Sequence, residues 1–438
     1  MNAIFAWFCV ALVAVAPLPL GSNRPVFWML WACLIGVFFM LFMVAKAIRR
    51  TDRPLRTAGF APHIALALVL PGWGLIQALP IGDWARALSY PNDLSPWLRT
   101  GSITIAPGAT VLSVIRLVSY VVFFALVLET ASRAGRVAAV IRAIFLIVTA
   151  YAVSGLVMLT VLGDAAPWGV KSAYHGMATG PFVNRNSFAS FLGLGLVIGV
   201  TLLMESGKDE RQATRIVAKL ALALATGLIF AALLATQSRL GLASSLVGAF
   251  VAGVAMRPGV PRRRRAAGRS IRIMTPVAIL AIGLAAFGTP VAERLLFSAP
   301  DLGVRLAIYG EALARIAERP LTGYGLDSFA LVHSLGRADA HFDDLIYTDA
   351  HSTYLENWVE GGLIAGSAPI LLGVLVASRL LRSLGDGTRT AAAAACGGLV
   401  LCATHSALDF PFEIEANMFL LLLVIALGLA APRRGADP

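Results

Sequence analysis

The sequence DAHSTYLENWVEGG, at residues 349–362, ends the only long polar stretch of an otherwise apolar chain. From Leu355 to Leu363 apolar residues recur at helical spacing and continue into an apolar run, which predicts a helix that enters a membrane. His351 is expected near the first turn of this helix. The polar stretch begins near residue 290 and holds three of the six histidines. We expect the chemistry of the protein here.

Two further pieces of this stretch have a predicted structure. Residues 304–313 form an amphipathic pattern, and Pro320 cannot donate the next helical hydrogen bond, so a helix that ends before Pro320 is predicted. Gly323 and Gly325 predict a turn. His333 is expected to be solvated in a loop.

The composition excludes an ordinary soluble protein. The chain has 438 residues, of which 58% are hydrophobic and 14% charged, and its mean hydropathy is +0.79, which is typical of polytopic membrane proteins. The net charge of +12 follows the loops between apolar runs, so no nucleic-acid partner is expected. Neither a metal site nor a disulfide framework is predicted, because four cysteines lie in apolar runs without ligand spacing: Cys9, Cys33, Cys396 and Cys402.

Twelve apolar runs are long enough to cross roughly 30 Å of hydrocarbon as helices, which predicts an all-α polytopic membrane protein. The first run lacks a basic leader, so a retained span is expected. Transmembrane helices 1–9 then occupy 1–289, a large loop 290–361, and helices 10–12 with a short tail 362–438. The runs lie at about 3–20, 25–46, 61–79, 112–130, 140–163, 187–204, 216–236, 240–256, 273–289, 362–378, 391–408 and 415–432.

Basic residues predict the orientation. With the N-terminus inside, the inner loops and the tail hold 24 of the 36 lysines and arginines. Both termini are therefore expected in the cytoplasm, and the loop 290–361 on the periplasmic face. A second outer segment, 81–110, includes an alternating, strand-like stretch at 103–110.

Arginines on the outer side are unexpected under the preference of basic residues for the cytoplasmic side, which suggests that they have a function. Arg239 lies in a tight hairpin at the outer ends of two spans, Arg185 in the approach to the sixth span, and Arg305 on a helix face with apolar residues. Converging arginines suit a diphosphate, because the planar guanidinium binds phosphate oxygens in pairs and keeps its charge. The alternatives for Arg239 are snorkelling to headgroups and an interhelical salt bridge. For Arg185 the alternative is a structural loop in which Asn186 or Ser187 caps the sixth span. Arg315 is expected to pair with Glu311 on the helix surface.

The histidines offer a base. His351 near a helix start is favoured in its neutral form by the helix dipole, and a neutral imidazole can take a hydroxyl proton. The alternative is a polar residue at the membrane surface. His405 and Asp409, four residues apart, are expected on one helix face, where Asp409 either anchors an arginine or orients a histidine. A plain polar pair at a helix end is the alternative.

Five motifs together resemble the O-antigen ligase superfamily, which includes Wzy-type polysaccharide polymerases. They are GPFVNRN at 180–186, Ser238-Arg239, Arg305 followed by RPLTGYG at 319–325, DAHSTYLE at 349–356, and DFP at 409–411. The resemblance covers essentially the whole chain. Ser352 stands where the family often has asparagine.

The resemblance implies a GT-C-like, metal-independent and cofactor-free glycosyltransferase of the bacterial inner membrane. Its donor would be a glycan on undecaprenyl diphosphate, and its acceptor a sugar hydroxyl of lipid A-core. Arg239, Arg305 and Arg185 would then hold the diphosphate and His351 would be the base, with Asp409, His405 and Tyr354 in support. Two alternatives stay open: a polymerase that joins lipid-linked repeat units, and a secondary transporter.

Overall fold

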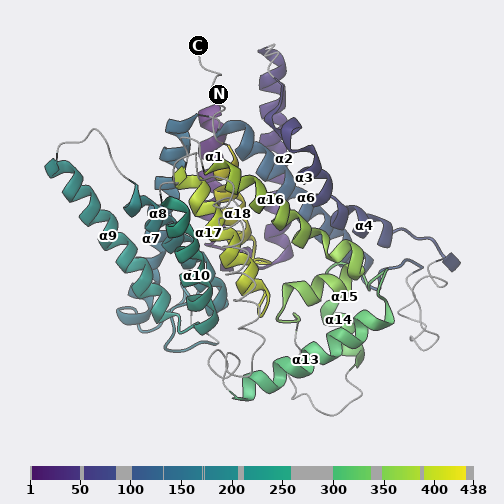
Figure 1. Cartoon of the computed structure of the whole chain (residues 1–438). Coiled ribbons are helices and arrows are strands. Elements are labelled where there is room, and N and C mark those ends of the chain that lie inside the picture. Colours follow the sequence, from purple (N-terminus) through teal and green to yellow (C-terminus); the bar gives the residue numbers. More distant parts are fainter. Residues whose placement is uncertain are drawn as a thin grey trace, which may run out of the picture.

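The computed structural model describes residues 2–49, 54–84, 101–131, 133–169, 171, 173–205, 212–257, 299–336, 348–384 and 389–430. Within these ranges the chain is helical and no strand is present (Figure 1). The elements are α1 (Asn2–Val15), η1 (Leu20–Ser22), α2 (Pro25–Ile48), η2 (Arg56–Phe60), α3 (Ala61–Ala67), α4 (Val69–Gln77), α6 (Pro107–Thr130), α7 (Ala134–Thr160), α8 (Arg185–Met204), α9 (Gln212–Ala235), α10 (Arg239–Met256), α13 (Ala299–Glu318), α14 (Phe329–Gly336), α15 (Thr353–Gly366), α16 (Ala368–Ser383), α17 (Arg389–Ser406) and α18 (Glu415–Leu429).

The apolar helices make the chain a polytopic membrane protein. Among the described residues six helices are long and apolar enough to cross a membrane, and up to eight spans result if each of two bent pairs counts as one. The third and tenth predicted spans coincide with the two bent pairs: α3 and α4 meet at 42°, and α15 and α16 at 68°. The count of twelve stays a prediction, and its ninth span, 273–289, lies outside the described residues.

Close helix contacts build the centre of the bundle. α10 packs against α8 and α17, and α17 packs against α18 (Figure 1). A Cβ atom added at Gly248 would stand 2.7 Å from the carbonyl oxygen of Gly397, and one at Gly397 would stand 2.5 Å from that of Gly248. Small residues therefore let α10 and α17 approach backbone to backbone, as is usual where lipid provides no hydrophobic driving force between helices.

The polar segment forms a second packed unit. In Figure 1 α13, α14 and α15 lie together at one end of the bundle. They share an apolar core with Ile308, Ala312, Phe329 and Val359 at its centre. The predicted helix before Pro320 is confirmed as α13.

Glycines let the turn after α13 pack closely against α15. Gly323 has a φ of +63° and Gly362 a φ of +72°. A Cβ at Gly323 would meet the carbonyl of Glu360 at 2.2 Å, so the predicted turn is a backbone contact that only glycine permits. α15 is broken at Gly362, whose backbone angles are not helical.

The strand-like stretch predicted at 103–110 is wrong, because Pro107 begins α6 instead of ending a strand. Residues 101–105 are irregular and bridge two elements. The N–H of Thr104 donates to the carbonyl of Gln77 at 3.0 Å, and that of Ile105 to the carbonyl of Tyr324 at 3.0 Å. The alternating pattern therefore reflects packing of this segment between α4 and the turn at Tyr324.

Candidate active site

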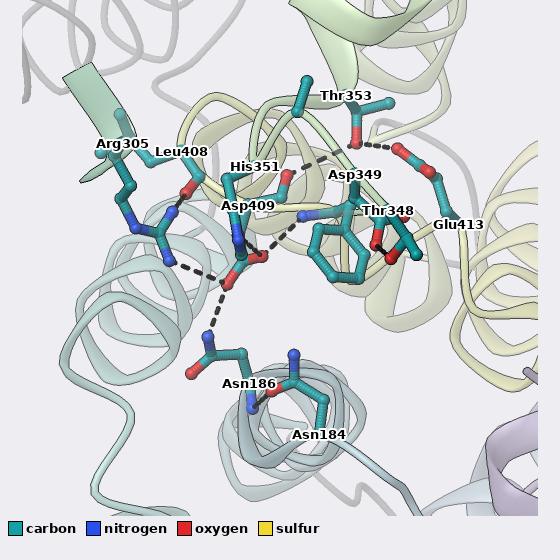
Figure 2. Close-up of polar contacts among 12 residues, drawn as sticks. Asn184, Asn186, Arg305, Thr348, Asp349, His351, Thr353, Leu408, Asp409 and Glu413 are labelled. Atoms are coloured by element: carbon teal, nitrogen blue, oxygen red, sulfur yellow. Dashed lines mark hydrogen bonds and ion pairs between the residues drawn. The ribbon is translucent and has the colours of Figure 1, made fainter. Parts of the chain in front are cut away.

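Asp409 is the centre of a polar cluster at the junction of the bundle and the polar segment (Figure 2). Its side chain is 1% exposed. Oδ1 accepts a hydrogen bond from the N–H of Phe410 at 2.9 Å and lies 3.5 Å from Nδ1 of His351. Oδ2 lies 3.9 Å from Nη2 of Arg305. One carboxylate thus faces a histidine with one oxygen and an arginine with the other.

Asp409 keeps its negative charge in this place. Burial raises its pKa, but the contact with His351 and the charge of Arg305 outweigh burial and hold the pKa of Asp409 well below its usual range. The carboxylate is therefore ionised at neutral pH. Because the ionised carboxylate faces Nδ1 of His351, it favours the tautomer of His351 that is protonated at Nδ1. Nε2 is then the basic nitrogen.

His351 is held in an unusual backbone conformation. Its φ is +51°, in the left-handed region that residues with a Cβ rarely adopt. The hydroxyl of Tyr309 donates to the carbonyl of His351 at 2.9 Å, and the ring of Phe410 packs 5.4 Å from the imidazole, centroid to centroid. Strain of this kind, about 1–3 kcal/mol, persists where surrounding contacts fix it and is common at functional sites.

Ser352 has a structural role of its own. As the N-cap of α15 its side chain accepts the hydrogen bond of the Leu355 N–H, which satisfies one of the unpaired donors at the helix start. The carboxylate of Glu356 accepts from the N–H of Ala350 at 2.9 Å and folds the loop back onto the helix. Serine in place of asparagine therefore still fixes the residue next to His351.

Arg305 reaches the cluster from α13. Its side chain is 13% exposed, and Nη1 donates to the carbonyl of Leu408 in addition to the ion pair with Asp409. Ile308 and Ala312, on the same face of α13, are buried in the core of the polar segment. Packing of that face thus directs the guanidinium to the bundle.

Two helix starts complete the cluster and contribute residues that the sequence analysis did not assign. Asn186 donates from Nδ2 to Oδ2 of Asp409 at 2.5 Å, and the hydroxyl of Ser238 donates to Oδ1 of Asn186 at 2.7 Å. Asn184 caps α8, and Ser238 caps α10. Asn186 or Ser187 was weighed as the cap of this helix, whereas the structure shows that Asn184 caps it and Asn186 binds Asp409. The positive dipole ends of α8 and α10 both approach Asp409.

The other predicted arginines stand at the edge of this cluster. Arg239 is exposed at the first residue of α10, and no ion pair joins it to another described residue. Arg185 turns toward the preceding loop, where its guanidinium lies 5.7 Å from the ring centroid of Tyr174 and Nη1 lies 2.8 Å from Sδ of Met177. The structure thus brings Arg305, His351 and Asp409 together and leaves Arg239 and Arg185 beside them.

The prediction that His405 and Asp409 share a helix face is wrong. α17 ends at Ser406, so Asp409 lies in the following turn. His405 is fully buried inside the bundle, and its Nδ1 lies 2.6 Å from the hydroxyl of Ser190. The hydroxyl of Tyr354 donates to the carbonyl of Ala403 at 2.9 Å. His405 and Tyr354 therefore pack helices together and do not contact Asp409.

Two expectations for the polar segment are also wrong. His333 is 1% exposed, and its Nδ1 lies 2.6 Å from Oε2 of Glu311, because α14 packs onto α13. Arg315 accordingly pairs with Glu318, at 2.9 Å, and not with Glu311. Periodicity within one helix could not reveal a partner on another helix.

Three carboxylates lie on the other side of the His351 loop. Oxygens of Asp349, Glu356 and Glu413 come within 4.8 Å of one another, a spacing that can hold a cation. The hydroxyl of Thr353 donates to Glu413 at 2.8 Å. Burial raises the pKa of Glu413 to about 7, and the charge of Asp349 adds to this, so a shared proton can also relieve their repulsion.

Arg116, in α6, was not singled out from the sequence. Its guanidinium stacks over the indole of Trp28 at 4.2 Å and lies in the field of Asp327, Glu413 and Glu415. An arginine within an apolar helix is a signal that a search for ionisable residues inside spans can find.

The comparison with known families covers part of the chain. Residues 222–370 match the model of the O-antigen ligase family, a range that contains Arg239, Arg305 and His351 and ends before Asp409. No curated protein shows a significant match to the chain. The chain is thus a polytopic membrane protein whose residues 222–370 are similar to the O-antigen ligase family, in agreement with the resemblance of its motifs.

Proposed function

We propose that the protein transfers a glycan from undecaprenyl diphosphate to a sugar hydroxyl of lipid A-core, at the periplasmic face of the bacterial inner membrane. The observation that carries this proposal is the double contact of Asp409 with His351 and Arg305. It places a candidate base and a fixed positive charge on two sides of one carboxylate. A glycosyl transfer with a diphosphate leaving group needs both.

His351 acts as the general base. With Nδ1 directed at Asp409, Nε2 takes the proton of the acceptor hydroxyl, and the ionised carboxylate stabilises the imidazolium that forms. The hydroxyl oxygen attacks the anomeric carbon as the bond from that carbon to the diphosphate oxygen breaks. A single displacement of this kind inverts the configuration at the anomeric carbon.

Arg305 receives the leaving group. The electron pair of the broken bond goes to undecaprenyl diphosphate, whose added charge is stabilised by the guanidinium and by the positive ends of α8 and α10. Arg185 and Arg239 are the first residues of α8 and α10, and we assign the outer phosphate oxygens to them. Neither step requires a metal, and we expect transfer by purified protein to survive EDTA.

The acceptor decides between a ligase and a polymerase. Both use the same donor, and the polymerase would pass the glycan to another lipid-linked repeat unit. Membrane lipids surround both substrates. A secondary transporter is less well supported, because the charged cluster lies at helix ends instead of the middle of interrupted spans.

The lipid-linked glycans of cells that lack the protein test the proposal. We expect long polyprenyl-linked glycans to accumulate with bare lipid A-core, and wild-type protein but not His351→Ala to restore transfer at equal membrane levels. Accumulation of single repeat units would identify a polymerase. An unchanged glycan profile would contradict the proposal and favour the transporter.

A further inference from the structure

A cavity of about 180 Å³ lies beside the His351 loop and has no part in the steps above. Four separate segments line it: the turn after α1, the loop before α8, the residues just before His351, and the turn after α17. Its volume is below the about 300–1,000 Å³ of pockets for drug-sized ligands. The cavity therefore suits one ring of a larger substrate.

The walls combine aromatic rings with hydrogen-bonding side chains. Tyr174, Phe182 and Phe410 contribute rings, and Asn184 and Asp349 contribute an amide and a carboxylate. Aromatic faces pack against the C–H groups of a ring, while carboxylates and amides pair with its hydroxyls. A sugar presents both kinds of surface at once, whereas an isoprenoid chain would leave the polar groups unpaired.

Ser187 gives an independent sign of a ligand. It lines the cavity and is 2% exposed. Its hydroxyl makes no hydrogen bond to any described residue. Buried hydroxyls are nearly always paired, so a hydroxyl in this position is explained by a polar molecule that enters the cavity.

The position of the cavity assigns it to one substrate. Phe410 belongs to its wall and also packs on the imidazole of His351, and Asp349 precedes His351 by two residues. Figure 2 shows Asp349 and Thr348 on one side of Asp409 and Arg305 on the other. A ring in the cavity is thus next to the base and away from the arginine, which is where the acceptor must be.

We propose that this cavity is the acceptor subsite and binds the single sugar ring whose hydroxyl is glycosylated. Asp349, Asn184 and Ser187 bind the remaining hydroxyls of that ring, and Phe410 supports its apolar face. This inference rests on the proposed function.

Steady-state transfer by the full-length protein in lipid nanodiscs tests the subsite. The acceptor is glycolipid purified from cells that lack the protein, the donor is their lipid-linked glycan, and each is varied in turn. Val183 lines the cavity and is 45% exposed, so Val183→Trp fills the cavity from its rim. Val161, 72% exposed at the end of α7, provides the matched control Val161→Trp.

We expect Val183→Trp and Asp349→Asn to raise the KM for the acceptor at least about tenfold, with the KM for the donor within about twofold of wild type. Val161→Trp should change neither constant. If Val183→Trp does not fold, Asp349→Asn decides.

An unchanged acceptor KM in the folded variants would overturn the subsite but not the proposed function, provided that His351→Ala abolishes transfer. A rise in the donor KM alone would overturn the subsite as well, because the cavity would then hold the donor. Transfer that survives both His351→Ala and Arg305→Ala would overturn the proposed function, and the subsite with it.

Discussion

The helix bundle and the polar segment of this protein are held together by different forces. In the bundle α10 and α17 touch through glycine backbones at Gly248 and Gly397, and van der Waals contact fixes their positions. In the polar segment a buried carboxylate binds backbone N–H groups. Oε1 of Glu360 accepts hydrogen bonds from the N–H groups of Ser328 and Phe329 at 2.9 and 3.0 Å. The polar segment thus adds buried hydrogen bonds to its apolar core.

The candidate site lies where these two regions meet. Asp409 and Asn186 come from the ends of bundle helices, while Arg305 and His351 come from the polar segment. We therefore expect substitutions in the bundle to lower mainly the stability of the protein. Substitutions at the junction should lower mainly its activity. The predictions below test this separation.

His351→Ala is expected to have the largest effect. Loss of a general base lowers the rate by about 10²–10⁴-fold, and a side chain that is 24% exposed can be removed with little change in stability. The measurement is the transfer rate together with the unfolding temperature. His175→Ala is the control, because its side chain is 67% exposed. A similar small loss in both variants would contradict the base assignment.

Asp409→Asn should come next. The amide keeps the shape but loses the charge that orients His351 and pairs with Arg305, so we expect the transfer rate to fall by about 10²-fold, the lower end of what a general base contributes. Because the group is buried, stability should fall too, unlike in His351→Ala. Measurement of the rate and the unfolding temperature separates the two effects. Wild-type transfer in this variant would show that the cluster is only structural.

Gly248→Ala tests the bundle. Its Cβ would stand 2.7 Å from the carbonyl of Gly397, whereas at Gly253, in the same helix, the nearest atom is Sδ of Met204 at 3.7 Å. We expect Gly248→Ala to lose about 1–3 kcal/mol of stability through overpacking. Gly253→Ala should gain up to about 1 kcal/mol from helix propensity. Thermal unfolding in detergent measures both, and equal shifts would contradict the close contact.

Glu413→Gln should have the smallest effect. The pKa of Glu413 rises from 4.5 to about 7 in the folded protein, so the folded state binds more protons between these values and stability falls as the pH rises from about 4.5 to about 7. The slope is at most about 1.4 kcal/mol per pH unit. We expect Glu413→Gln to flatten the decrease in unfolding temperature between pH 5 and pH 7. If the unfolding temperature of Glu413→Gln falls as steeply with pH as that of the wild type, other carboxylates cause the decrease.

The sequence predicted the elements well and the contacts between them poorly. Helical periodicity found α13 and α15, and the glycines of the turn at Gly323 and Gly325 marked a real constraint. Hydropathy could not show the bends between α3 and α4 or between α15 and α16, because a straight helix and a bent pair of helices give the same apolar pattern.

For the site, the sequence identified several residues but few of their partners. Arg305 was chosen because a charge on the outer side is costly, His351 for its place near a helix start, and Asp409 for its spacing from His405. The structure brings Arg305, His351 and Asp409 together. His405 was chosen by its spacing from Asp409, but α17 ends between them, and its hydrogen-bond partner is Ser190. Asn186 was weighed only as a cap, since its partner is 223 residues away in the sequence.

The most direct test of the central claim, that Arg305 binds the leaving diphosphate opposite His351, is the transfer rate of purified Arg305→Lys. Lysine keeps the charge but loses the planar fork that binds two phosphate oxygens. We predict a rate at least about tenfold below wild type, while Arg315→Lys, which changes an arginine paired with Glu318 on the same helix, keeps the wild-type rate. A wild-type rate in Arg305→Lys, or an equal loss in both variants, would contradict the account.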